Sequence, residues 1–185
     1  MNSNILLNLS IKAAQFHEIK KQKRGHDREI PYFTHPLACA MWVLEDHNGV
    51  LTTKQREIAA LTLLFHDVLE DTDATEYEVY KCLIEYFDIE YSNEILKNIK
   101  LCTLAPGLGS KDEYEIMKTK DLPDVIWYVK LVDKYFNLFG SHHYLEKKGM
   151  LDFYKEFLNF LAEKCETTSY SGSKFISQAK CLANA

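Results

Sequence analysis

Long apolar runs are absent from this 185-residue chain. No stretch is long enough to span a bilayer, which takes about 20 predominantly apolar residues in a row. The N-terminus also lacks the basic segment and the continuous apolar core of a secretory signal peptide. We therefore expect a protein that is neither inserted in a membrane nor exported.

Closely spaced cysteines are missing as well. The five cysteines are odd in number and widely separated, with no CxxC pair among Cys39, Cys82, Cys102, Cys165 and Cys181. This usage is typical of reduced, mostly buried thiols and indicates a cytoplasmic protein.

An excess of positive charge is also lacking, because the formal net charge is -5. The chain therefore has no general electrostatic footprint for nucleic-acid binding. An anionic small molecule would need a local basic patch, and the dense candidate comprises Lys20, Lys21, Lys23, Arg24 and Arg28. The alternative is that these residues form the solvated end of a helix, where the dipole favours basic side chains.

Internal repeats, low-complexity tracts and domain linkers are not evident either. Apolar residues make up 46% of the chain and charged residues 26%, which is ordinary for a globular protein. The length predicts one domain, and apolar residues recur at helical spacing nearly throughout. The expected helices cover about residues 3–23, 36–47, 75–87, 91–104, 111–119, 151–161 and 173–183, with two more that start at Thr52 or Thr53 and at Pro123. The fold predicted from this pattern is a single all-α domain over residues 1–185.

The segment FHDVLEDTDAT (residues 65–75) carries the strongest chemical signal. It ends the apolar run IAALTLLF (58–65), which predicts a buried helix. Residues three and four apart share a helix face, so His66, Asp67, Glu70 and Asp71 would crowd one helix end. Acidic side chains there face an unfavourable dipole, for which a divalent cation would compensate. The alternative is a helix that ends in a solvated acidic stretch.

Two further segments supply side chains that can bind a metal ion. In PYFTHP (31–36), His35 precedes Pro36, which favours extended geometry at His35 and the first turn of a helix at Pro36. In VKLVDKYFNL (129–138), Asp133 interrupts an apolar stretch, where an unpaired carboxylate would be costly. Either a cation or a salt bridge to Lys130 or Lys134 would satisfy it. Combined with the first segment, they predict a site of two imidazoles and two carboxylates, formed by His35, His66, Asp67 and Asp133. Such a ligand set suits Mn, Fe, Zn or Co.

In order and spacing, PYFTHPLACA, FHDVLEDTDAT and VKLVDKYFNL resemble the motifs of the HD-domain phosphohydrolases. Within them, the chain is similar to the alarmone hydrolase domain of RelA/SpoT homologues, and most to the small stand-alone hydrolases typified by the metazoan SpoT homologue. The acidic pair Glu70 and Asp71 distinguishes this branch from other HD proteins. The resemblance covers a core of about residues 10–140, and the C-terminal helices, about 141–185, are less distinctive.

This resemblance implies a helical HD bundle whose metal site is formed by several helices. It implies one Mn²⁺ per chain, although other divalent transition metals also suit the ligands. The family assigns Glu70 and Asp71 to catalysis. The expected partner is a small nucleotide, and the implied reaction removes the 3′-diphosphate of ppGpp or pppGpp and releases pyrophosphate.

Two residues match substrate-binding positions of the family, namely Arg24 and Asn137. The chain departs from the family at Gly25, where a lysine is usual, and at Gly140, where the long enzymes have a threonine. These departures concern the nucleotide pocket and leave the metal ligands unchanged.

Two alternatives stay open at this point. One is a phosphohydrolase of the same fold that acts on another nucleotide, such as ppApp or NADPH. The other is a non-catalytic nucleotide sensor, against which the presence of Glu70 and Asp71 argues. No synthetase region follows the hydrolase region, so we expect the protein to degrade the alarmone without making it.

Overall fold

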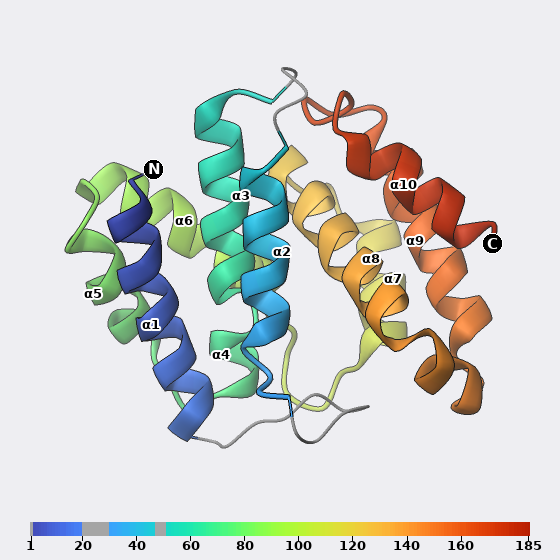
Figure 1. Ribbon diagram of the computed structural model, residues 1–185, viewed down its shortest axis with the longest axis horizontal. Helices are drawn as coiled ribbons and strands as arrows, with labels where there is room; N and C mark the ends of the chain where they lie inside the picture. The colour runs from blue at the N-terminus through green and yellow to red at the C-terminus, as the bar shows by residue number, and fades with distance from the viewer. Residues whose placement is uncertain (1, 20–29, 47–50) are drawn as a thin grey trace.

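The computed structural model describes residues 2–19, 30–46 and 51–185. In these residues the secondary structure is helical, without a β-strand, which confirms the predicted all-α class (Figure 1). The helices are α1 (Ser3–Ile19), α2 (Thr34–Leu44), α3 (Thr53–Phe65), α4 (Val68–Asp71), α5 (Glu76–Ile84), α6 (Ile89–Cys102), α7 (Ser110–Thr119), α8 (Asp124–Lys147), α9 (Leu151–Cys165) and α10 (Lys174–Ala183). None of the described helices combines the length and the apolar character needed to cross a bilayer.

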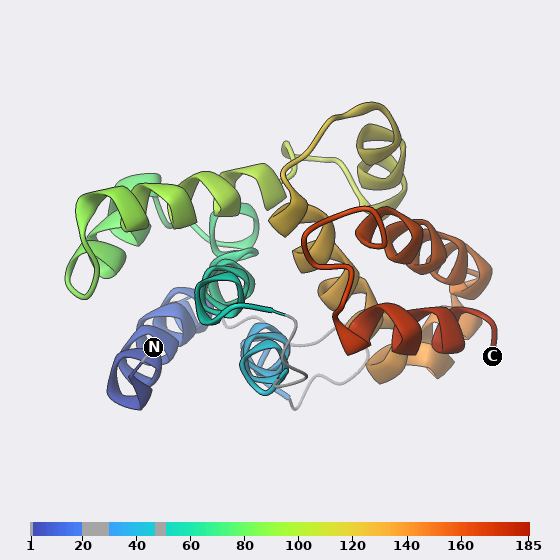
Figure 2. The same cartoon turned by 90° about the horizontal axis from the view of Figure 1, so that it is seen from above.

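Helix α3 occupies the centre of the molecule. It packs against α1, α2, α6 and α8, and Figure 2 shows it nearly end-on between its neighbours. The apolar run at 58–65 was predicted to form a buried helix, and every residue from Ile58 to Phe65 is buried in α3. Helix α8 packs against α9 and α10 as well as against α3. The contact of α3 with α8 therefore brings the end of the central helix against the middle of the longest helix.

The predicted start signals explain where two helices begin. The Thr52 hydroxyl oxygen accepts a hydrogen bond from the backbone amide of Gln55, and the side-chain oxygen of Gln55 accepts one from the backbone amide of Thr52. Thr75 and Glu78 form the same reciprocal capping box at the start of α5. These bonds satisfy amide groups that have no partner within the first turn of a helix.

Replacing Thr75 with alanine should lower the free energy of unfolding by about 1 kcal/mol, because the cap hydroxyl is lost from the start of α5. Urea denaturation of the two proteins measures this difference. Thr119→Ala is a suitable control, since the Thr119 hydroxyl bonds a carbonyl, that of Ile116, and caps no amide. Equal losses in the two variants would contradict a capping role for Thr75.

The expectation for His35 was wrong in one respect. His35 lies in the first turn of α2, which begins at Thr34, and is not extended. A tight turn precedes the helix, in which the amides of Thr34 and His35 donate to the carbonyls of Pro31 and Tyr32. Pro36 is tolerated because first-turn amides lack partners within the helix in any case. The turn thus overrides the preference of a residue that precedes proline.

Candidate metal centre

His66 and Asp67 lie at the junction between two helices and not at the end of a single helix. His66 is the C-terminal cap of α3, and Asp67 is the N-terminal cap of the one-turn helix α4, which carries Glu70 and Asp71. The sequence predicted one helix here, and the structure has two. His66 and Asp67 keep backbone angles of the α-helical region, but the regular hydrogen bonding of α3 ends before them. The Asp71 amide still donates to the Asp67 carbonyl at 2.8 Å, so the expected spacing of these two residues holds.

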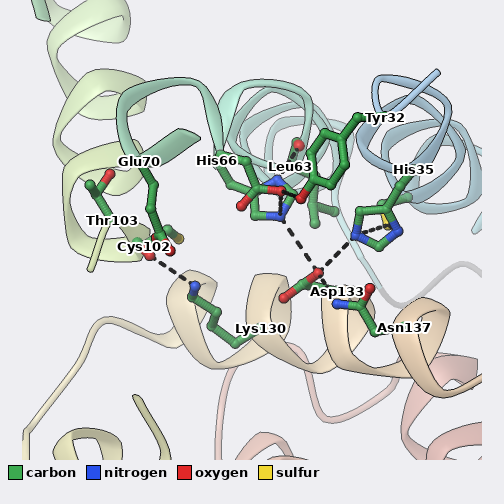
Figure 3. Close-up of polar contacts among 12 residues, drawn as sticks. Tyr32, His35, Leu63, His66, Glu70, Cys102, Thr103, Lys130, Asp133 and Asn137 are labelled. Atoms are coloured by element: carbon green, nitrogen blue, oxygen red, sulfur yellow. Dashed lines mark hydrogen bonds and ion pairs between the residues drawn. The ribbon is translucent and has the colours of Figure 1, made fainter. Parts of the chain in front are cut away.

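Three of the four predicted ligands meet at one buried point. His35 comes from α2, His66 from the end of α3 and Asp133 from α8, and one potential ligand atom from each lies within 4.8 Å of the others. Asp133 Oδ1 is 2.9 Å from His35 Nε2 and 3.5 Å from His66 Nε2 (Figure 3). Segments nearly 100 residues apart in the chain are thus joined by residues that are at most 3% exposed.

Asp67, the fourth predicted ligand, lies beside this group and not within it. Its Oδ2 is 3.0 Å from His66 Nε2 and accepts a hydrogen bond of 2.5 Å from the Tyr32 hydroxyl. Tyr32 therefore orients the Asp67 carboxylate next to the three converging side chains. Tyr32 was not among the predicted site residues, although its place in PYFTHP puts it one turn before His35.

The orientation of His66 suits metal binding. Its Nδ1 is 2.7 Å from the Leu63 carbonyl oxygen, which only accepts, so Nδ1 carries the proton. Its Nε2 is buried and makes no hydrogen bond within the part of the chain that the structure describes, despite the short distance to Asp67. A histidine whose one nitrogen is fixed by a carbonyl presents the other as a ligand. The nitrogen and oxygen donors present therefore fit a divalent transition metal.

The carboxylates of the cluster favour a bound positive charge. Burial lowers the pKa of His66, but the carboxylates of Asp67 and Asp133 outweigh burial and raise this pKa to about 10. Burial raises the pKa of Asp133, whereas Lys134 and the two histidines hold it well below its usual range. The carboxylates thus stay ionised, and a cation among them is favoured by the same attraction that holds a proton on His66.

The acidic pair of α4 lines the approach to the cluster. Glu70 Oε2 accepts a hydrogen bond of 2.9 Å from the Leu104 amide, which follows α6. Burial, followed by the charges of Asp67 and Glu70, raises the pKa of Asp71 to about 6. Glu70 is therefore held in a fixed orientation by the backbone. The raised pKa of Asp71 lets this carboxylate take up a proton near neutral pH.

A cavity of about 260 Å³ opens onto these residues. The predicted site residues on its wall are Asp67, Glu70, Asp71, Asp133 and Asn137. Other wall residues were not predicted as site residues, among them Ser110, Glu113, Lys130, Lys134 and Tyr154. Lys130 and Lys134 were considered from the sequence only as possible salt-bridge partners of Asp133, and no local signal points to Ser110, Glu113 or Tyr154.

The salt bridge weighed as an alternative at Asp133 is present together with the histidine contacts. Lys134 Nζ lies 2.9 Å from Asp133 Oδ2, whereas Lys130 is paired with Glu113. Asn137 donates to Asp133 Oδ1 at 2.8 Å, one turn along α8. The two oxygens of Asp133 thus have separate neighbours, and Oδ1 is the one that faces the imidazoles.

The predicted substrate-binding residues have different outcomes. Asn137 lies on the cavity wall beside Asp133. Arg24 lies outside the described residues, as do Gly25 and the rest of the basic cluster at 20–28. The role of Arg24 stays a prediction.

Comparison with known proteins finds similarity in structure but not in sequence. No protein-family model matches the chain, and a search of curated proteins finds no relative by sequence. Among solved structures, the chain is similar to a metazoan orthologue of SpoT, described as a protein that hydrolyses ppGpp and plays a role in starvation responses. The TM-score is 0.69 at 19% sequence identity, and the match covers 99% of this chain and 94% of that chain. The chain therefore has the HD-domain fold of SpoT-like hydrolases.

Proposed function

We propose that the protein is a metal-dependent phosphohydrolase that removes the 3′-diphosphate of ppGpp or pppGpp and releases pyrophosphate. The observation that carries this proposal is the convergence of His35, His66 and Asp133 from three helices, with Asp67 beside them, next to a cavity lined by Glu70 and Asp71. The likeness in fold to a protein described as hydrolysing ppGpp supports the choice of substrate class.

The residues that would hold the cation are His35, His66, Asp67 and Asp133. A divalent metal such as Mn²⁺, when bound, lowers the pKa of a water molecule and neutralises charge on a phosphoryl oxygen. The protein residues supply a fixed donor set: Leu63 and Tyr32 orient His66 and Asp67, and Lys134 neutralises the outer oxygen of Asp133.

Glu70 and Asp71 are the candidates for proton transfer. Phosphoryl transfer depends mainly on positioning and electrostatic stabilisation, so a water molecule and a proton acceptor are the main chemical requirements. The bond from the Leu104 amide leaves Glu70 Oε1 as the oxygen that can accept a proton from water. Lys130 and Lys134 line the same cavity, and their ammonium groups are paired with the carboxylates of Glu113 and Asp133.

Replacing Asn137 with alanine should raise KM for ppGpp more than it lowers kcat, because the amide faces the cavity without belonging to the donor set. We expect the same division for Arg24→Ala, since the guanidinium offers two parallel hydrogen bonds to an anion. Steady-state kinetics with ppGpp and with GTP measure both effects. A decrease in kcat alone in either variant would contradict a role in nucleotide binding.

The substrate itself is tested by a comparison of nucleotides. With Mn²⁺ present, kcat/KM should be higher for ppGpp and pppGpp than for ppApp, NADPH or GTP. A higher value for ppApp or NADPH would assign the site to another nucleotide, and metal-loaded protein that binds ppGpp without turnover would identify a sensor.

A further inference from the structure

Glu113 connects α7 to the candidate metal centre, although α7 contributes no predicted ligand. Its side chain is 4% exposed, and its two oxygens contact two lysines of α8: Oε1 is 2.5 Å from Lys130 Nζ and Oε2 is 2.7 Å from Lys134 Nζ. The two lysines are four residues apart and therefore share a helix face. A single carboxylate thus bridges both ammonium groups on the wall of the cavity.

The two lysines differ in their second contact. Lys134 Nζ also contacts Asp133 Oδ2 at 2.9 Å, so its charge is divided between two carboxylates. Lys130 Nζ instead donates to the Cys102 carbonyl at 2.8 Å, as Figure 3 shows, and within the described residues it contacts no predicted ligand. Lys134 is therefore the lysine through which Glu113 can act on Asp133.

Stability alone is a weak explanation for such a network. Buried ion pairs lose much of their attraction to the cost of desolvation, and apolar replacements are often equally stable. Here two buried lysines are balanced by Glu113 and Asp133, and one member of the balance is a predicted metal ligand. The network can therefore change how strongly the Asp133 carboxylate attracts a cation.

We propose that Glu113 is a positioning residue of the metal centre, which draws Lys134 toward α7 so that Asp133 remains available to a divalent cation. Without Glu113, Lys134 would have Asp133 as its one carboxylate contact among the described residues and would compete with the cation for it. This inference rests on the proposed metal site but not on the identity of the nucleotide.

The test is Mn²⁺ affinity, measured on metal-stripped full-length protein by calorimetry and by the electron paramagnetic resonance signal of free Mn²⁺. Glu113→Gln keeps the size of the side chain and removes its charge. We expect Mn²⁺ to bind at least about tenfold more weakly, because removal of one partner leaves a buried charge uncompensated. Far-UV circular dichroism and the thermal midpoint establish that the variant is folded.

Two double variants separate positioning from net charge. Both restore the balance of the network by replacing a lysine with methionine, which fills a similar space. Glu113→Gln with Lys134→Met should restore Mn²⁺ affinity to within about threefold of wild type, because the competing ammonium is gone. Glu113→Gln with Lys130→Met should stay weak, because Lys134 remains beside Asp133.

Several results would overturn the inference. One is an unchanged Mn²⁺ affinity in Glu113→Gln. Another is that both lysine replacements restore Mn²⁺ affinity equally, because the effect would then depend on net charge alone. If Glu113→Gln does not fold, Glu113→Asp carries the test, since it keeps the charge but is one methylene shorter; a wild-type affinity in that variant would also overturn the inference. Wild-type protein that binds no Mn²⁺ would instead overturn the proposed metal site, and this inference with it.

Discussion

Replacing Asp133 with alanine should remove both the bound metal and the hydrolytic activity. Asp133 Oδ1 is the atom that both imidazoles approach, at 2.9 Å and 3.5 Å, so its loss leaves the histidines without a carboxylate between them. Mutation of groups that merely orient a ligand typically costs about 10- to 100-fold in metal affinity or activity, and loss of a ligand should cost more. Elemental analysis of protein purified without chelator, together with an assay of ppGpp turnover, measures both effects.

His66→Ala should give the same result, whereas His143→Ala serves as the matched control. His143 is a histidine of α8 whose side chain is 94% exposed and does not belong to the cluster of His35, His66 and Asp133. Metal content of about one ion per chain in His143→Ala and near zero in the two ligand variants is expected. A wild-type metal content in either His66→Ala or Asp133→Ala would show that the cluster does not hold the metal.

Glu70→Gln should retain the metal but lose most of the turnover. The substitution removes a proton acceptor next to the cavity while it preserves the size of the side chain and an oxygen that can accept the bond from the Leu104 amide. General acid–base catalysis typically contributes about 10²- to 10⁴-fold, and we expect kcat to fall by that factor. Turnover numbers at equal metal occupancy measure the effect.

Glu76→Gln is the matched control for this substitution. Glu76 is a glutamate of the first turn of α5 that is exposed and paired with Lys100 at 2.8 Å, away from the cavity. Its replacement should leave kcat unchanged. A Glu70→Gln enzyme with the turnover of Glu76→Gln would identify Glu70 as a carboxylate that only fixes the loop after α6.

The fold followed from local signals in the sequence. The start of α3 at Thr52 and the start of α8 after Pro123 are each encoded within a few residues, and the structure has both where they were predicted. The break between His66 and Asp67 was not predicted, because no proline or glycine marks it. Helical periodicity alone does not distinguish one helix from two that share a direction.

The convergence of the site was predictable in part, since buried polar residues in apolar segments require partners. This requirement pointed to Asp133, whereas His35 was predicted from its place before Pro36 and His66 from its place among the acidic residues of FHDVLEDTDAT. The structure brings the three side chains together. These arguments could not identify Glu113 or the Leu104 amide, because their roles arise from contacts between segments that are 17 or more residues apart. Such contacts depend on how α7 and the end of α6 pack, which no short pattern encodes.

The most direct test of the central claim is to identify the phosphorus product of ppGpp treated with the Mn²⁺-loaded protein, by ³¹P NMR. Cleavage at the 3′ position by the proposed reaction should yield pyrophosphate and GDP in equal amounts, and Asp133→Ala should yield neither. Release of orthophosphate in place of pyrophosphate, or intact ppGpp after incubation with metal-loaded wild-type protein, would contradict the account.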